Sequence, residues 1–177
     1  MHWYGKTRHF IGPVEDLGLG EKVQQAQVHL PSELGGLSAR LEDWMRFLGY
    51  PRRDIFAVQL VLHEAASNAY RHGNRGDPDK SIRVSYLVAP DEVLVVVEDQ
   101  GRGFDPDLVP DPLAENIRDR PLGLGLLLMR AYSSWVHFDP PGNRVIFCRR
   151  RSDTPVPGLP GPSGPAAEQG LCDPEHQ

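Results

Sequence analysis

Residues 58–74, VQLVLHEAASNAYRHGN, form the stretch that decides the expected fold of this chain. Read as a helix, the stretch has an apolar face that can enter a core, made of Val58, Leu62, Ala65 and Ala69. Glu64, Asn68 and His72 recur every four residues on another face. A carboxylate can accept a proton and an amide oxygen suits magnesium, so this face predicts the edge of an active site. Polar residues at this spacing also occur on the solvated side of any amphipathic helix, so other parts of the chain must decide between the two interpretations.

The composition is that of one soluble globular domain, because 177 residues with 40% hydrophobic side chains can bury a substantial core. The net charge of −5 is spread along the chain, which argues against direct nucleic-acid binding. Two cysteines indicate neither a disulfide framework nor a zinc site, and they favour a reducing compartment. We find no secretory signal and no apolar run of the roughly 18 residues that a membrane span needs, so we expect a cytoplasmic protein without a membrane segment.

Three regions follow from the distribution of glycine, proline and apolar residues. Residues 1–22 carry several glycines and little periodicity, which predicts an N-terminal extension. Residues 23–150 contain the periodic segments and form the expected folded domain. Residues 151–177 are rich in proline and glycine with almost no large apolar side chains, which predicts a disordered tail.

The first half of the domain predicts one strand and two helices. Residues 23–30 alternate weakly, as an edge strand does, and Ser32 is placed to cap a following helix. Apolar residues at spacings of three and four predict that helix over residues 33–48. Its apolar face consists of Leu34, Leu37, Leu41, Trp44, Met45 and Leu48. Gly49 ends this helix, and Asp54 can start the second helix, which contains the stretch quoted above.

The second half predicts two hairpins that are separated by a long loop and a helix. The expected elements are strands at 82–88 and 93–97, a loop at 104–122 with a short helix at 113–117, a buried helix at 125–132, and strands at 135–138 and 144–148. The β-branched run in the second strand is typical of a central strand. Long loops inside a compact domain are commonly functional lids.

Two glycine-containing motifs complete the candidate site. Asp99, at the end of the central strand, can accept a hydrogen bond from an exocyclic amine, which would discriminate adenine from guanine. Gly101 and Gly103 remove side chains where a backbone approaches a ligand, although a plain glycine turn has the same pattern. The motif Gly123-Leu124-Gly125 precedes a helix whose first N–H groups could hold phosphate oxygens, and it could equally serve close helix packing.

Other ligand motifs fit less well. A Rossmann fingerprint and a P-loop are both absent from the sequence. Asp99, Asp105 and Asp107 are close together, but the spacing and terminal glutamate of a calcium-binding EF-hand are missing. The histidines lack paired metal-ligand spacing. The motifs together therefore favour a nucleotide.

Three motifs in fixed order resemble one family: Glu64-Ala-Ala-Ser-Asn68 with His72, Asp99-Gln-Gly-Arg-Gly103-Phe104, and Gly123-Leu-Gly125. They are similar to those of the GHKL (Bergerat-fold) ATPase and kinase superfamily, and most like those of the small anti-sigma-factor serine kinases of the RsbW type. The resemblance covers about residues 23–150. It implies an α/β fold, an α+β two-layer sandwich whose mixed, mainly antiparallel sheet has helices on one face.

The resemblance also implies ATP and Mg²⁺ as cofactors and assigns roles to the site residues. Glu64 would be the general base, accepting the proton of a partner's serine hydroxyl or, in an ATPase, activating water. Asn68 would coordinate magnesium and Asp99 would hold the adenine amine. The remaining nucleotide-binding residues would be His72, Gly101, Gly103, Phe104, Gly123, Leu124 and Gly125.

The family's usual circuit is a partner switch. In it, the kinase sequesters a sigma factor or phosphorylates a STAS-type antagonist protein. A homodimer through the first strand and helix, as in relatives, stays open.

Two other functions also stay open: a non-catalytic ATP-binding interaction module, and an ATPase without a protein acceptor. Arg118 and Arg120 in the lid could approach phosphates.

Overall fold

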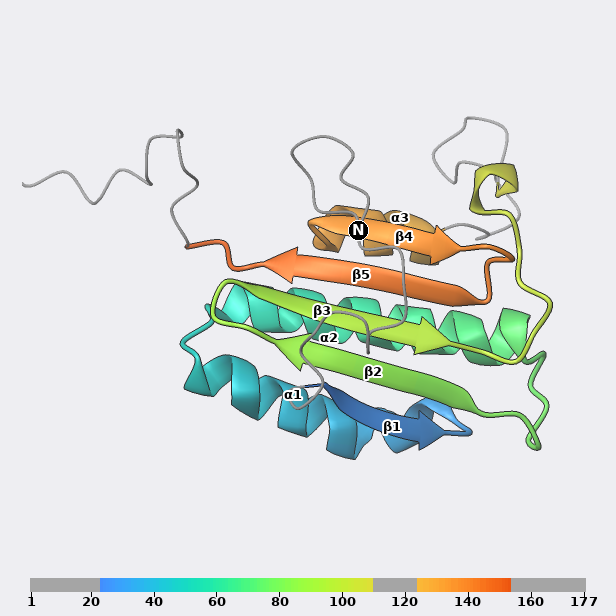
Figure 1. Ribbon diagram of the computed structural model, residues 1–177, viewed down its shortest axis with the longest axis horizontal. Coiled ribbons are helices and arrows are strands. Elements are labelled where there is room, and N and C mark those ends of the chain that lie inside the picture. Colours follow the sequence, from blue (N-terminus) through green and yellow to red (C-terminus); the bar gives the residue numbers. More distant parts are fainter. Residues whose placement is uncertain (1–22, 110–123, 154–177) are drawn as a thin grey trace, which may run out of the picture.

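The fold consists of a sheet of five strands and three α-helices in the computed structural model, which describes residues 23–109 and 124–153 (Figure 1). The strands are β1 (Gln24–Val28), β2 (Ile82–Val88), β3 (Glu92–Glu98), β4 (Trp135–Asp139) and β5 (Arg144–Arg150). The helices are α1 (Gly35–Phe47), α2 (Arg52–Asn68) and α3 (Leu124–Tyr132). Several predicted features lie outside the described residues: the extension at 1–22, the lid beyond residue 109 with its short helix and two arginines, Gly123, and the tail beyond residue 153.

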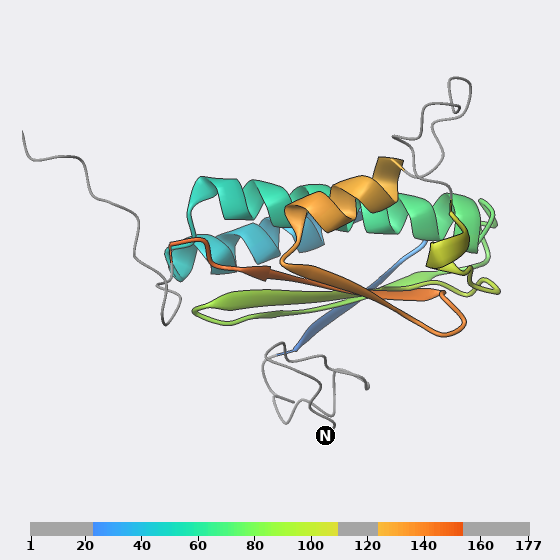
Figure 2. The same ribbon diagram turned by 90° about the horizontal axis from the view of Figure 1, so that it is seen from above.

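The sheet has the order β1-β2-β3-β5-β4, and every pairing between these strands is antiparallel. The hairpins β2–β3 and β4–β5 are joined where β3 pairs with β5. The three helices lie on one side of the sheet (Figure 2). The two-layer α/β architecture expected from the sequence is confirmed, with β1 at an edge and β3 in the centre. The expected sheet is mixed and mainly antiparallel, and the described strands show antiparallel pairings only.

The core lies between the helices and the sheet, because each strand turns alternate side chains toward the helices. The predicted apolar face of α2 is buried there, namely Val58, Leu62, Ala65 and Ala69. Strand residues that join the same cluster include Val84, Val95 and Phe147. Each fully buried valine, leucine or phenylalanine side chain of this cluster stabilises the fold by roughly 1.5–3 kcal/mol. This packing therefore fixes the orientation of α2, and with it the direction of its polar face.

The start of α1 differs from the prediction. A 3₁₀ turn (Pro31–Leu34) precedes the helix and has Leu30 at its N-cap position, so Ser32 is not the cap. Glu33 instead satisfies a free backbone donor, since its carboxylate accepts a 2.8 Å hydrogen bond from the N–H of His29. In a capping box the glutamate would bind the N–H of the N-cap residue, here Leu30, so this bond lies one residue before that position.

The end of α1 is as predicted. Gly49 has φ +76°, and the N–H of Tyr50 donates a 2.9 Å bond to the carbonyl of Met45, as in a Schellman motif. Leu41 and Met45 are fully buried. Trp44 is 51% exposed, contrary to the prediction, because the buried stripe follows the i, i+4 positions and leaves the residue beside Met45 outside it.

The start of α2 is also different. Pro51, with ψ 149°, takes the N-cap position, and the helix begins at Arg52 rather than at Asp54. Proline suits this end of a helix because the first N–H groups have no partner within the helix. Asp54 consequently lies in the first turn, where its side chain is fully buried.

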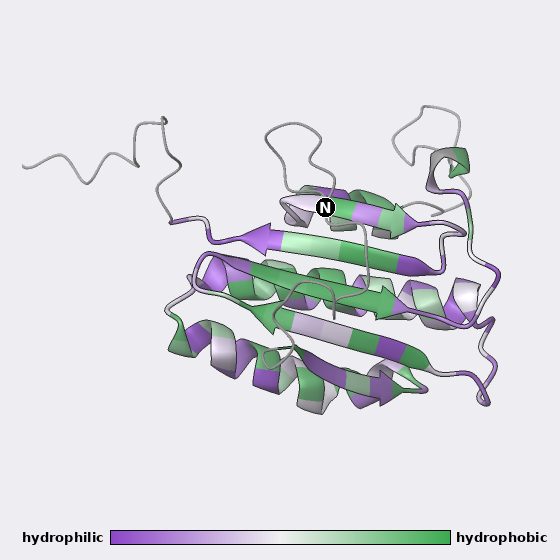
Figure 3. Ribbon diagram, viewed as in Figure 1, coloured by the Kyte–Doolittle hydropathy of each residue, from purple (hydrophilic) through white to green (hydrophobic). Residues whose placement is uncertain are grey.

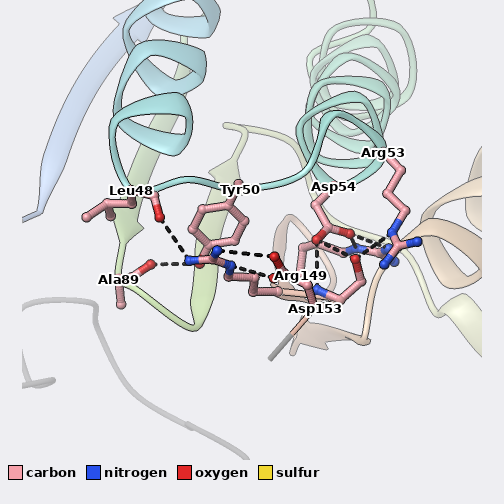
Figure 4. Close-up of polar contacts among 9 residues, drawn as sticks. Leu48, Tyr50, Arg53, Asp54, Ala89, Arg149 and Asp153 are labelled. Carbon is pink, nitrogen blue, oxygen red and sulfur yellow. Dashed lines mark hydrogen bonds and ion pairs between the residues drawn. The ribbon is translucent and has the colours of Figure 1, made fainter. Parts of the chain in front are cut away.

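Asp54 binds the chain segment that follows β5. Figure 4 shows Arg149 beside its carboxylate, with Nε at 2.9 Å and Nη2 at 2.6 Å from Oδ1. Ser152 donates to Oδ2 from its backbone N–H and from its hydroxyl, both at 2.8 Å. Arg151 donates a 2.9 Å bond to the carbonyl of Leu48, at the end of α1. These contacts tie the described end of the chain to the end of α1 and to the start of α2.

α3 is less buried than its Leu-Leu-Leu-Met content predicts. Met129 is the fully buried residue of this helix, whereas Leu124 is 49% exposed. The helix packs on α2 with one side only, and its first turn borders the cavity described below. The hairpin of β4 and β5 and its turn at residues 140–143 are as predicted. No helix in the described ranges is long and apolar enough to cross a membrane.

Candidate functional site

The polar face of α2 meets the first turn of α3. Gly125 lies over Glu64 and Asn68, since a methyl group on its Cα would lie 3.1 Å from Glu64 Oε2 and 3.0 Å from Asn68 Nδ2. Such distances are tighter than ordinary van der Waals contact, so glycine leaves both polar groups in place. The fold thus brings together two predicted motifs that are far apart in the sequence.

Asp99 lies directly after β3, against the end of the long helix. Beyond α2 the helix continues as a π turn over Ala69–Gly73, closed by a 2.7 Å bond from the N–H of Asn74 to the carbonyl of Ala69. Turns of this kind are rare and frequently occur at functional sites. Here the wide turn brings Gly73 against the carboxylate of Asp99, so closely that a methyl group on Gly73 would overlap its carbon and both oxygens.

The carboxylate of Asp99 is partly desolvated. Burial raises the pKa of Asp99 above its ordinary value, and the neighbouring charge of Glu98 acts in the same direction. The N–H of Gly101 donates a 2.7 Å bond to Oδ1 and, together with the charge of Lys80, partly opposes this shift. Hydrogen bonds are stronger in a site of low dielectric, so Asp99 is a good acceptor for a ligand donor.

Two asparagines fix the backbone around Asp99. Asn143, in the β4–β5 turn, donates a 2.9 Å side-chain bond to the carbonyl of Asp99, and its own carbonyl accepts a 2.9 Å bond from the N–H of Asp99. Asn74 is fully buried. It accepts a 2.9 Å bond from the N–H of Gln100 and donates a 3.0 Å bond to the carbonyl of Ser81. Because buried polar groups are costly to leave unpaired, these bonds hold the backbone that carries the Asp99 carboxylate in one conformation.

The glycine loop after Asp99 packs on the β4–β5 turn. Gly103 has φ +75°, and a methyl group there would overlap the carbonyl of Pro141. Gly101 is restricted in the same way by the carbonyl of Gly73. The close approach that the structure shows at both glycines is therefore to other protein backbone. Phe104 then turns its ring onto Phe138, with the ring centres 5.4 Å apart and an interplanar angle of 71°.

These elements surround a cavity of about 520 Å³. Small-molecule sites are commonly of about 300–1,000 Å³. The predicted site residues that line it are Glu64, Asn68, His72, Asp99, Gly103, Phe104, Leu124 and Gly125. Gly101 contributes as the donor to Asp99, and Gly123 lies outside the described residues. The structure therefore gathers the described members of the predicted set around one cavity.

Part of the site is not predicted by the sequence motifs. The additional lining residues include Arg71, Val97, Leu126, Met129, Phe138 and Asn143. Gly73 and Asn74 directly follow His72 within residues 58–74, so their position is a usable signal. Asn143 belongs to a turn whose sequence predicts only a hairpin connection. Its role depends on the packing of that turn against the glycine loop, which no local pattern shows.

The donor set at the cavity suits magnesium. No group of three or more His, Cys, Asp or Glu side chains that could hold a metal ion occurs within residues 23–109 and 124–153. Mg²⁺ does not need such a group, because it is usually held by one or two protein oxygens together with phosphates and water. The amide of Asn68, which lines the cavity beside Glu64, fits that pattern.

The chain belongs to the histidine kinase-like ATPase family, whose domain model matches residues 29–149. It is similar to the serine-protein kinase RsbW of Bacillus licheniformis, with 29% identity over 111 residues, 56% of this chain and 66% of the relative. RsbW of Bacillus pumilus is 29% identical over 129 residues, 63% of this chain and 76% of the relative. RsbW of Listeria monocytogenes is 33% identical over 57 residues, 32% and 36% of the two chains. The family resemblance predicted from three motifs is confirmed.

Proposed function

We propose that this chain is an ATP- and Mg²⁺-dependent protein serine kinase that acts as an anti-sigma-factor-like, partner-switching regulator. The observation that supports this function is the arrangement of one cavity, with the acceptor Asp99 in one part and Glu64 beside Asn68 in another. Glu64 and Gly73, which contacts Asp99, are nine positions apart, or about 13 Å along a helix at 1.5 Å per residue. This separation suits an extended nucleotide.

In the proposed complex the base lies at Asp99. Its carboxylate would accept a hydrogen bond from the adenine amine, and guanine has a carbonyl at that position. Phe138 and Phe104 would supply apolar surface for the purine ring. A site built around a partly buried acceptor rejects a ligand that lacks the matching donor, because the acceptor would remain unpaired.

The phosphates lie at the other part of the cavity in this proposal. The first N–H groups of α3 and the positive end of its dipole favour phosphate oxygens, and Arg71 lines the same cavity. Asn68 would hold Mg²⁺, which when bound neutralises charge on the phosphoryl group. Glu64 would accept the proton of the attacking serine hydroxyl as the new oxygen–phosphorus bond forms and the bond from the γ-phosphorus to the bridging oxygen breaks, which releases ADP. Gly125 keeps that carboxylate accessible.

The partners follow from the likeness to relatives named as serine-protein kinases. We infer that a sigma factor, a STAS-type antagonist protein or both bind this chain in a cytoplasmic switch. The phosphoacceptor would be a serine of the antagonist. A homodimer through β1 and α1 is compatible with the position of β1 at an edge of the sheet.

Glu64→Gln tests the proposal. The variant should bind Mg²⁺-ATP as the wild type does, but transfer radiolabelled γ-phosphate to a STAS-type protein roughly 10² to 10⁴ times more slowly. His63→Gln is a matched control, because His63 is exposed on the same helix and does not line the cavity. Unchanged transfer in Glu64→Gln would remove Glu64 from the mechanism.

The same assay separates two other functions. ATP-dependent binding of the partner without any phosphoprotein would indicate an interaction module whose nucleotide controls affinity. Release of inorganic phosphate without a partner would indicate an ATPase. Either result would contradict the kinase proposal while leaving the nucleotide site intact.

A further inference from the structure

The sheet has a second apolar face, opposite the described helices. We call its centre the apolar strip: Leu94 and Val96 of β3 with Ile146 and Cys148 of β5. These residues alternate with core residues such as Val95, and Val96 packs with Ile146 in a cluster separate from the main core. Figure 3 shows the middle of both strands in the hydrophobic colour. An antiparallel sheet with one solvated face usually alternates apolar and polar residues, whereas this pattern is typical of a sheet covered on both faces.

Three of the four residues of the apolar strip are buried, and Leu94 is partly buried. Val96 is 6% exposed, Ile146 1% and Cys148 0%. The described helices cannot account for this burial, because α1, α2 and α3 all lie on the other side of the sheet (Figure 2). These exposed fractions are those of the single chain, so the cover must come from another part of the chain.

The N-terminal end of the described chain lies at this face of the sheet. Val23, the first described residue, packs against the cluster of Val96 and Ile146. The 22 residues before it are rich in large apolar side chains, among them Trp3, Tyr4, Phe10, Ile11, Val14, Leu17 and Leu19. Five strands at about 4.8 Å spacing make a sheet about 24 Å wide, and a segment of this length can span up to about 70 Å. The segment is therefore long enough to cross the whole face of the sheet.

The C-terminal part of the chain is less suited to this role. The described chain ends beside α2, on the helix side, where Ser152 binds Asp54. The residues that follow are mainly proline, glycine and polar types. They offer few side chains that could replace water on an apolar sheet face.

We propose that residues 1–22 form the cover of this face and pack their aromatic and aliphatic side chains on the apolar strip. The segment is then part of the folded unit. This inference concerns the side of the sheet opposite the nucleotide cavity and does not depend on the proposed kinase activity.

Cys148 provides a reporter in the full-length chain. Cys172→Ser leaves it as the single thiol, and burial, with Glu92 close by, raises the pKa of Cys148. The thiolate is the reactive form, so a maleimide should label the folded protein slowly. Phe10→Asp with Ile11→Asp introduces charge into the proposed contact and should raise the labelling rate at least about tenfold by opening the cover. Thr7→Asp with His9→Asp adds the same charge at polar positions of the segment and should leave the rate unchanged.

The rate comparison requires that all variants remain folded, which far-UV circular dichroism checks. Equal labelling rates in the parent and the Phe10→Asp, Ile11→Asp variant would overturn the proposal. A second measurement does not depend on destabilising anything: benzoylphenylalanine replaces Phe10 in the full-length chain, and ¹⁴N and ¹⁵N chains are mixed before irradiation. Cross-links to residues 92–98 or 144–150 within one isotopic chain support the proposal. Mixed-isotope cross-links would assign the cover to a second copy and so contradict it, as would cross-links to other regions only.

Discussion

Gly73→Ala tests the geometry of the proposed adenine site directly. Gly73 has no positive φ, so alanine meets no backbone strain at this position. The new methyl group would, however, overlap the carbon and both oxygens of the Asp99 carboxylate. Asp99 would have to rotate away from the N–H of Gly101, which holds it at 2.7 Å. The substitution should therefore disturb the acceptor without removing any group that binds the ligand.

The expected magnitudes follow from the hydrogen bond between Asp99 and the adenine amine, which the rotated carboxylate could no longer accept. A hydrogen bond to a charged group contributes about 1.5–3 kcal/mol, so the Kd for Mg²⁺-ATP should rise about 10- to 150-fold. Overpacking at the site should lower the free energy of unfolding by about 1–3 kcal/mol. ATP at about 100 times the wild-type Kd stabilises the wild type by about 2.7 kcal/mol, and a 30-fold weaker site would leave only about 0.9 kcal/mol.

Urea unfolding with and without Mg²⁺-ATP measures both quantities. Gly36→Ala is the matched control, because a methyl group there has only Arg40 Nη1, at 4.0 Å, as a neighbour. In an Asp99→Ala background the overlapping atoms are gone, so Gly73→Ala should then cost nothing in the apo protein. The coupling between the two sites should be about 1–3 kcal/mol. A Gly73→Ala protein that unfolds and binds ATP as the wild type does would refute the reasoning.

Four further predictions concern single residues. Burial raises the pKa of Asp99 in the folded protein, so the unfolded chain loses this proton at a lower pH. The free energy of unfolding should therefore fall as the pH rises from about 4 toward the raised pKa. Asp99→Asn should flatten that part of a plot of urea midpoint against pH and abolish stabilisation by ATP. Asn74→Ala leaves the buried carbonyl of Ser81 and the part-buried N–H of Gln100 without their side-chain partner, so it should lower the free energy of unfolding by about 1–3 kcal/mol and reduce the preference for ATP over GTP in a competition assay. Asp54→Ala removes the buried partner of Arg149 and should cost about 3–5 kcal/mol in thermal unfolding while leaving the Kd for ATP unchanged. Gly125→Ala should displace both Glu64 and Asn68, so it should slow phosphotransfer and also weaken binding of Mg²⁺-ATP, which kcat and KM measure separately.

The parts of the fold that could be predicted have signals within one element. α2 carries a period of four in both its apolar and its polar residues, and β3 carries a continuous β-branched run. α3 shows the limit of such signals, because its apolar content predicted burial while only Met129 is fully buried. Apolar side chains beside a ligand cavity and apolar side chains inside a core are the same in composition. Only the neighbouring elements distinguish the two cases.

The orientation of Asp99 is a property that no single motif contains. The sequence shows that an aspartate directly follows the predicted central strand. The place of its carboxylate, however, depends on Gly73 at the end of the long helix and on Asn143 in the β4–β5 turn. Asn74 adds a third restraint by joining the loop after Asp99 to the residue before β2. These segments meet only once α2 and both hairpins are packed. The glycine motif that marks the site in the sequence therefore serves mainly to allow this meeting of backbones, and the orientation of the Asp99 carboxylate depends on the completed fold.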